Sequence, residues 1–459
     1  MANRQLYTSD TIAAVATASG FGGIGIVRLS GPKAYTLALT LTGKSGLTPR
    51  TAHYTAFRTD GGDTIDTGLT LYFPAPHSFT GEDVIELQGH GGPIVLNSLL
   101  RRCFELGARQ ARPGEFSERA FLNDKLDLVQ AEAIADLISA QTETAARLAQ
   151  SSLRGDFSRD VHQLANHLLK LRVYVEAAID FPEEEIDFLS DGHVKEQLKE
   201  GLTLGETIHQ RAQQGLIYQS GATVVLAGKP NAGKSSLLNN LAGDALAIVT
   251  NVPGTTRDVI REHINIAGVP IHILDTAGLR QSDDVIEQEG IRRAQKAIAD
   301  ADLVLHLCDD NSPQSAEEPE LLGLSHDNII KVLTKIDQSG RPATSTSTTA
   351  PSTMTLSRTV CISNITGDGL PALKKTILHF LGVQEATQSP YSARERHLLA
   401  LTNTLTLLRD ANDQFLATGA GELLAEDLRR AHDELGQITG VLSSDDLLGE
   451  IFSSFCIGK

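Results

Sequence analysis

The segment from Gly228 to Ser236, Gly-Lys-Pro-Asn-Ala-Gly-Lys-Ser-Ser, constrains the fold of this chain more than any other stretch. It matches the pattern G-x-x-x-x-G-K-[ST], in which glycines let backbone N–H groups and a helix N-terminus point at phosphates. An apolar run from Thr223 to Ala227 predicts a buried strand before it, and Ser235 to Leu241 has helical spacing. This context predicts a nucleotide-phosphate site, with Lys234 as a point charge and Ser235 as a Mg²⁺ ligand.

Length, composition and charge limit the class of protein. A chain of 459 residues with 41% hydrophobic content predicts about three folded domains. A basic-then-apolar leader and an uncharged apolar run of about 18 residues are both missing, so we expect a cytoplasmic protein. The four cysteines, at 103, 308, 361 and 456, lack the spacing of a disulfide framework or zinc site. The net charge of −17 argues that any RNA contact is local or shared with a partner.

Hydrophobic periodicity divides the chain into four stretches. Residues 1–123 carry short strand-like runs separated by turn signals and predict an α+β domain. Residues 124–220 and 383–459 have helical spacing, and both are too amphipathic to stand alone, so we expect one discontinuous all-α bundle. Residues 221–382 alternate strands and helices, which predicts an inserted Ras-like P-loop G domain with a mostly parallel sheet. The fold class is therefore multidomain α/β.

Three further segments have simpler interpretations. Gly20 to Gly25 satisfies G-x-G-x-x-G, but strand-like residues follow it, so a tight glycine turn is favoured over a dinucleotide fingerprint. The acidic break from Asp180 to Phe188 contains Pro182 and predicts a solvated connection between helices. The stretch from Ser339 to Thr355 is rich in Ser, Thr, Pro and Ala and predicts a surface loop.

Motifs in the alternating domain indicate guanine nucleotide chemistry. Asp275-Thr-Ala-Gly278 follows a strand and offers a carboxylate for the Mg²⁺ shell, and Thr256 can lend a hydroxyl to the same metal. Thr334-Lys-Ile-Asp337 resembles the [NT]-K-x-D motif, in which one carboxylate accepts N1–H and the 2-amino group of guanine, so GTP is preferred over ATP. Thr in place of the commoner Asn weakens one expected ring contact, and Ser363-Asn364 replaces the commoner Ser-Ala.

Hydrolysis needs a group that orients water, and Leu279 occupies the position of the Ras-like glutamine. The acidic run 283–289, with Glu287, offers a carboxylate for this role or forms a solvated helix start. Asn231 in the phosphate loop either holds a monovalent cation near the β/γ-phosphates or stabilises the loop. The residues that these motifs predict to bind GTP are Asn231, Ala232, Gly233, Lys234, Ser235, Ser236, Thr255, Thr256, Asp275, Thr276, Ala277, Gly278, Thr334, Lys335, Asp337 and Ser363.

Six segments together resemble one family over essentially the whole chain, the MnmE (TrmE) tRNA-modification GTPases. They are Gly22-Gly-Ile-Gly-Ile-Val-Arg28, Phe79-Thr-Gly-Glu-Asp83, Gln88-Gly-His-Gly-Gly92, Arg112-Pro-Gly-Glu-Phe-Ser117, Gly254-Thr-Thr-Arg-Asp258 and Phe455-Cys-Ile-Gly-Lys459. The resemblance implies an N-terminal folate-binding and dimerisation domain, the discontinuous helical domain and the inserted G domain. It also implies a homodimer that acts with the flavoprotein MnmG (GidA) at C5 of the wobble uridine of certain tRNAs.

The resemblance also implies site residues. The family's K⁺ site falls on Asn231, Thr250, Val252 and Thr255, and its water-orienting glutamate falls on Glu287. The same loop adds Thr250, Asn251, Val252, Pro253 and Gly254 to the expected GTP-binding residues. Its site for 5-formyl- or methylene-tetrahydrofolate falls on Arg28, Glu86, Lys125 and Lys459. Since a pterin amino edge suits a carboxylate and a folate tail suits cations, these residue types are chemically suitable.

Cys456 lies near this expected folate site according to the same resemblance. It either acts as a nucleophile or closes the tail over the pocket, whereas a prenylation box fits poorly with a final Lys459. Two other function classes stay open from the residues: a ribosome-assembly GTPase, which usually appends a basic RNA-binding module, and a pure switch whose GTP cycle gates a complex.

Overall fold

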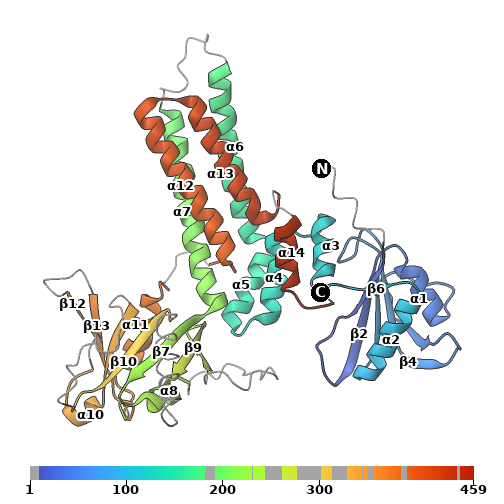
Figure 1. The fold of residues 1–459 in the computed structure, drawn as a ribbon, viewed down its shortest axis with the longest axis horizontal. Coiled ribbons are helices and arrows are strands. Elements are labelled where there is room, and N and C mark those ends of the chain that lie inside the picture. Colours follow the sequence, from blue (N-terminus) through green and yellow to red (C-terminus); the bar gives the residue numbers. More distant parts are fainter. Residues whose placement is uncertain are drawn as a thin grey trace, which may run out of the picture. The chain divides into compact units, whose positions relative to one another are not determined.

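A computed structural model describes residues 10–180, 192–229, 231–242, 261–275, 301–312, 328–343, 345–349, 356–383, 390–441 and 445–458. The chain forms two compact units. The first comprises Met1–Ala135, Ser152–Gly201 and Asn403–Lys459, and the second comprises Asp136–Ser151 and Leu202–Thr402. Figure 1 colours both units along the sequence. The four-part division at residues 123, 220 and 382 remains a prediction.

The first unit contains a six-stranded sheet in the order β3-β4-β5-β2-β1-β6. Its strands are β1 (Ile12–Val15), β2 (Gly22–Ser30), β3 (His53–Arg58), β4 (Thr64–Phe73), β5 (Val84–Gly91) and β6 (Arg109–Gln110). Only β1 and β6 pair in parallel. Helices α1 (Ala34–Thr42) and α2 (Pro93–Glu105) pack on one face, where alternate residues such as Val27 and Leu87 are fully buried. The predicted α+β character is confirmed.

The glycine-rich segment at residues 20–25 overlaps the start of β2 and shows no dinucleotide-binding context. Strand β2 pairs antiparallel with β1 and β5, so the parallel βαβ unit of such a site is not formed by these strands. A Cβ at Gly25 would lie 2.7 Å from the Leu96 side chain and 2.9 Å from the Gly91 Cα. Glycine at position 25 is therefore explained by close packing.

The helices of the first unit come from both sides of the inserted region. Their bounds are α3 (Glu115–Leu122), α4 (Leu128–Ser139), α5 (Glu143–Leu153), α6 (Asp156–Asp180), α7 (His193–Ser220), α12 (Glu395–Thr418), α13 (Gly421–Thr439) and α14 (Asp445–Ser453). Helices α4, α5, α7 and α12 are divided between the two units. Helix α13 packs along α6, as Figure 1 shows. Segments more than 200 residues apart in sequence thus share one helical layer, which confirms the discontinuous bundle. The acidic break at 180–188 lies outside the described residues except Asp180, which ends α6.

The second unit contains a seven-stranded sheet in the order β12-β13-β11-β10-β7-β9-β8. Its strands are β7 (Ala222–Gly228), β8 (Arg261–Ile266), β9 (Val269–Asp275), β10 (Leu303–Asp309), β11 (Ile329–Thr334), β12 (Ser345–Thr349) and β13 (Leu356–Cys361). The inner pairs are parallel, and β8 and β12 are antiparallel edges. Helices α8 (Lys234–Ala242), α10 (Ile336–Ser339) and α11 (Leu370–Phe380) complete the described elements. This is the predicted mostly parallel G-domain sheet.

Two expectations need correction. The stretch 339–355 was predicted to be a surface loop, but β12 within it pairs antiparallel with β13. The edge pairing satisfies backbone groups of a segment whose Ser and Thr side chains have little apolar surface to bury. In α4, the apolar spacing of Val129, Ala133 and Leu137 places Glu132 and Asp136 away from the apolar face, yet both acidic residues are buried. Asp136 is buried because Ser392 Oγ and Arg394 Nη2 donate to it, at 2.8 and 2.7 Å.

Among the residues that the structure describes, no helix is both long enough and apolar enough to span a membrane.

Candidate functional site

The phosphate loop connects the end of β7 to the start of α8. Gly228 and Gly233 have φ angles of 149° and 90°, which β-carbon-bearing residues rarely adopt, and Asn231 between them has a φ of 65°. A Cβ at Gly228 would lie 2.5 Å from the Leu307 carbonyl oxygen of the neighbouring strand β10. The two glycines of the sequence pattern are therefore required by the curl of the loop and by its contact with the sheet.

Lys234, the expected point charge for the phosphates, is buried in the structure. Its Nζ donates to the carbonyls of Gly228 at 2.7 Å and Lys229 at 3.1 Å, which bridges the start of the loop to the first residue of α8. Ser235 and Ser236 are exposed at the same helix terminus. An α-helix N-terminus with a lysine and two hydroxyls fits a phosphate with its Mg²⁺, because N–H groups and the cation face the anion while hydroxyl oxygen suits the metal.

Asp337 lies at the start of α10, just after the end of β11. The Ser363 hydroxyl donates to Asp337 Oδ1 at 2.6 Å and accepts the N–H groups of Ile365 and Thr366, both at 3.2 Å. Ser363 is fully buried, whereas Asp337 is exposed. The carboxylate is thus held in one orientation at the surface, as the reading of a guanine edge requires.

Lys335 precedes this carboxylate and has a φ of 62°. Its Nζ contacts Asp309 Oδ2 at 2.7 Å, at the end of β10. The hydrogen bond from Lys335 lowers the pKa of Asp309, with help from the Asn311 N–H. Lys335 therefore joins the ends of two neighbouring parallel strands, the edge at which α/β sheets bind their ligands.

Thr334, for which the sequence predicts a weakened contact to the guanine ring, makes side-chain contacts within the protein. Its side chain is fully buried, and its hydroxyl donates to the Ala232 carbonyl of the phosphate loop at 2.9 Å. The hydroxyl also lies 3.3 Å from the Cys308 carbonyl. Threonine here joins the segment that carries Asp337 to the phosphate loop.

Several expected GTP and metal residues lie outside the described residues. Asp275 is the last residue of β9, opposite Leu226 of β7, which puts its backbone beside the strand that leads into the phosphate loop. The expected residues that are not described are Thr250, Asn251, Val252, Pro253, Gly254, Thr255, Thr256, Thr276, Ala277, Gly278, Glu287 and Lys459. Their roles remain predictions.

Arg28 and Glu86 face each other across β2 and β5 in the first unit. They are register partners, and Arg28 Nη2 lies 2.8 Å from Glu86 Oε1. The guanidinium carbon of Arg28 is 5.8 Å from the ring centres of both Phe79 and Phe116. A pair with 23% and 16% of its side chains exposed, flanked by two aromatic rings, offers opposite charges and stacking surfaces to a flat heterocycle.

Lys125 contacts the same loop that carries Phe79. Its Nζ donates to the Pro76 carbonyl at 2.9 Å, and a Cβ at Gly81 would lie 3.4 Å from its side chain. The nearby Asn123 also donates to this loop, at the Thr80 carbonyl. One loop between β4 and β5 therefore contacts both Arg28 and Lys125, two of the residues predicted for folate.

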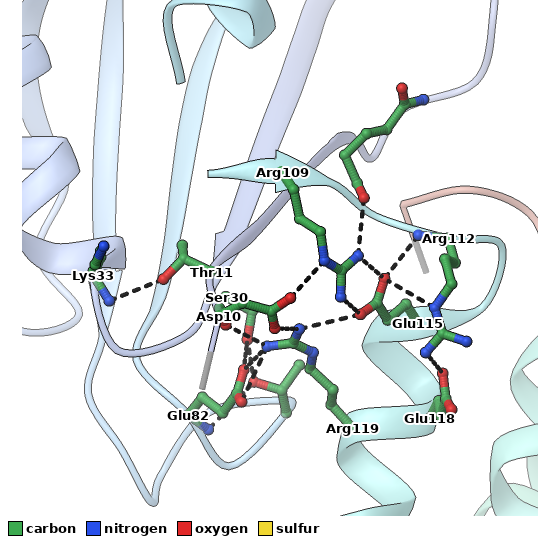
Figure 2. A network of polar contacts seen from close by, with 12 residues as sticks. Asp10, Thr11, Ser30, Lys33, Glu82, Arg109, Arg112, Glu115, Glu118 and Arg119 are labelled. Atoms are coloured by element: carbon green, nitrogen blue, oxygen red, sulfur yellow. Dashed lines mark hydrogen bonds and ion pairs between the residues drawn. The ribbon is translucent and has the colours of Figure 1, made fainter. Parts of the chain in front are cut away.

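A buried ion network lies next to this site and was not found from sequence (Figure 2). Arg119 contacts Asp10 at 2.7 Å, Glu82 at 3.0 Å and Glu115 at 3.1 Å. Burial alone would raise the pKa of Glu115, but hydrogen bonds from Arg109, the Arg112 N–H and Arg119 lower it. The Ser30 hydroxyl, two residues from Arg28 on β2, donates to Glu82 at 2.6 Å. The network therefore supports the strand that carries Arg28.

The C-terminal segment is attached to the same unit. Phe452 and Phe455 pack with Phe121 in one cluster, and Ile457 forms a β-bridge with Pro113. Gly458, with a φ of 96°, lies against the Val15 carbonyl, where a Cβ would not fit. Cys456 lies within this attached segment and is exposed, whereas Cys103, Cys308 and Cys361 are buried. Burial raises the pKa of Cys103 to about 12, so that thiol is not reactive.

A parallel sheet with a phosphate loop and an oriented aspartate at its strand ends defines a P-loop guanine-nucleotide-binding protein. Family models match the MnmE helical domain over residues 128–456 and the N-terminus of the GTP-binding protein TrmE over residues 11–125. The tRNA modification GTPase MnmE of Stutzerimonas stutzeri is 56% identical over 98% of this chain and 99% of its own. The tRNA modification GTPase MnmE of Ectopseudomonas mendocina is 56% identical over 99% of this chain and 100% of its own. The chain belongs to the MnmE family of tRNA modification GTPases.

Among solved structures, the G domain of the T. maritima FeoB iron transporter is 28% identical, with a TM-score of 0.25. The match covers 35% of this chain and 98% of the FeoB G domain.

Proposed function

We propose that this tRNA modification GTPase is stimulated by K⁺ and by dimerisation of its G domains. The proposal rests on Asn231, which is exposed in the phosphate loop with its backbone in the left-handed region. The exposed side chain offers an amide oxygen to a monovalent cation, which would neutralise phosphate charge beside the loop. Thr250, Val252 and Thr255 complete the proposed cation site, and Mg²⁺ is held by Ser235 and Thr256.

The proposed modification reaction takes place in the first unit, at Arg28, Glu86, Lys125, Lys459 and Cys456. With a flavoprotein partner, MnmG (GidA), the protein adds an aminomethyl or carboxymethylaminomethyl group at C5 of the wobble uridine (U34), and a bound tetrahydrofolate would supply the one-carbon unit. The paired carboxylate and guanidinium orient the pterin, and Lys125 and Lys459 attract the folate tail. Support comes from the aromatic flanks of Arg28 and from the exposed Cys456 on its attached segment.

A cytoplasmic homodimer is part of the same proposal. In the N-terminal domain, Phe21, Ile24, Tyr54 and Ile94 are between 71% and 95% exposed. Phe21, Ile24 and Ile94 come from neighbouring segments, since Gly22 pairs with Gly91, and large apolar side chains that gather on a surface favour burial against another protein. With a net charge of −17, the tRNA is bound locally or mainly through the partner.

The first prediction concerns the cation. GTP hydrolysis by the full chain is expected to be about tenfold faster or more in KCl than in NaCl at equal ionic strength, because a site built for K⁺ fits the smaller Na⁺ poorly. Asn231→Ala should lose this difference, and Glu287→Ala should lose hydrolysis in both salts while still binding GDP. Equal wild-type rates in the two salts would falsify the cation site.

The second prediction separates modification chemistry from a pure switch. Cys456→Ser is expected to abolish tRNA modification in the presence of the flavoprotein partner and folate, while GTP hydrolysis changes by less than about twofold, because the thiol lies in the unit without the G domain. Ser453→Ala, an exposed change in the same segment, serves as the control. Normal modification by the serine variant would favour the pure switch.

A further inference from the structure

Asn364 follows the serine that holds the guanine-reading aspartate and has no role in the site described so far. Its side-chain Nδ2 lies 3.2 Å from the Gly233 carbonyl oxygen in the phosphate loop. Asn240 of α8 donates its side-chain amide to the Asn364 carbonyl at 2.8 Å and lies 3.3 Å from Asn364 Oδ1. Since Oδ1 faces a donor and Nδ2 faces an acceptor, both ends of the Asn364 amide are matched in one orientation.

The bond to Gly233 acts on a particular peptide group. A trans peptide is planar, so its C=O and N–H point in opposite directions, and the N–H partner of the Gly233 carbonyl is that of Lys234. The same carbonyl accepts the first bond of α8, from the Leu237 N–H at 2.9 Å. Two donors on one side of this peptide fix the Lys234 N–H toward the opposite side, where the phosphates bind.

The adjacent peptide is fixed in a similar way. Thr334 donates to the Ala232 carbonyl at 2.9 Å, which orients the Gly233 N–H. Thr334 belongs to the same segment as the base-reading Asp337. Asn364 directly follows Ser363, which holds the Asp337 carboxylate. Consecutive peptides of the phosphate loop are therefore held by the two segments that carry guanine recognition.

We propose that Asn364 is a positioning residue for GTP binding, which orients the Lys234 N–H toward the phosphates and joins the phosphate loop to the guanine-reading segment. Its side chain acts through the loop and not through the base. Its contribution to binding affinity should therefore be the same for any purine nucleoside diphosphate, whichever base the nucleotide carries.

The test compares GDP with IDP, which lacks the 2-amino group that Asp337 accepts. Affinities are measured by calorimetry on the full-length wild type, Asn364→Ala and Asn364→Asp, in KCl and Mg²⁺. Asn364→Ala should weaken GDP and IDP by the same factor, about five- to tenfold, for the loss of one neutral hydrogen bond. Asn364→Asp keeps the size of the side chain but turns an oxygen toward the Gly233 carbonyl, so its loss should exceed that of alanine for both nucleotides. A purely steric role would leave the aspartate variant close to wild type.

Asn240→Ala gives a second route, because it releases Asn364 without altering the loop. It should weaken both nucleotides by about two- to threefold, and the double variant should be no weaker than Asn364→Ala alone, since the two residues act in series. Wild-type affinities in Asn364→Ala and Asn364→Asp overturn the proposal. So does a loss confined to GDP, because Asn364 would then act on the base. If the Asn364 variants do not fold, unchanged binding by Asn240→Ala overturns it as well.

Discussion

Replacing Asp337 with asparagine is expected to convert the GTPase into an enzyme that prefers xanthosine triphosphate. The Ser363 hydroxyl donates to Asp337 Oδ1, and an asparagine oxygen can keep this bond. The second carboxylate oxygen becomes an NH₂ group, which faces the guanine 2-amino group as donor against donor. Xanthine carries a carbonyl at that position and can accept the new donor.

The expected loss of GTP affinity is about 100-fold, since a hydrogen bond to a charged acceptor is replaced by two opposed donors. The change in preference is measured by comparing the hydrolysis rates of GTP, ITP and XTP at matched concentrations. XTP should become the best substrate. Asp368→Asn is a matched control, because Asp368 is exposed in the neighbouring loop and bonds Thr366. If Asp337→Asn still prefers GTP over XTP, the carboxylate does not read the base.

Replacing Arg119 with methionine is expected to cause the largest loss of stability among single changes in the N-terminal domain. Arg119 has 3% of its side chain exposed and contacts Asp10, Glu82 and Glu115. Removing the cation leaves Glu82, with 10% of its side chain exposed, without its arginine, and takes one arginine partner from the buried Glu115, which costs about 3–5 kcal/mol. Thermal and urea unfolding at pH 7 measure this change. Arg430→Met, which removes an exposed arginine paired with Glu426 on α13, should have little effect.

The same network predicts how stability depends on pH. The folded-state pKa of Glu115 is lowered, so its contribution is present above its unfolded pKa of about 4.3 and is lost as pH falls through the folded value. Glu115→Gln should therefore destabilise the protein at neutral pH, and its difference from wild type should shrink in acid. A difference that stays constant between pH 7 and pH 3 would mean that the Glu115 charge contributes nothing.

The nucleotide site was largely predictable because its signals are local. The glycine spacing of the phosphate loop, the strand before it and the helix after it follow from periodicity within about twenty residues. Asp337 and Ser363 each follow a predicted strand, and parallel strands bring their carboxyl ends to one edge. The structure confirmed these elements and placed the two side chains 2.6 Å apart.

Other features required contacts that no local pattern encodes. Thr334 and Asn364 looked like departures from a motif, whereas the structure bonds them to carbonyls 102 and 131 residues away. The strand β12 was missed because its residues are polar, and an edge strand is stabilised by backbone pairing with a neighbour that sequence does not identify.

By itself, the sequence determined the class of chemistry: a GTP-binding loop, an aspartate in the position proposed to read guanine, and an alternating domain inserted between helical segments. Each depends on residue type and spacing over short distances. Only the tertiary structure decided that Arg28 pairs with Glu86 between two aromatic rings, that Arg119 joins three carboxylates and that the C-terminal segment attaches beside Pro113. The reason is physical, because strand register and long-range packing set which distant side chains meet, and burial then gives these contacts their strength.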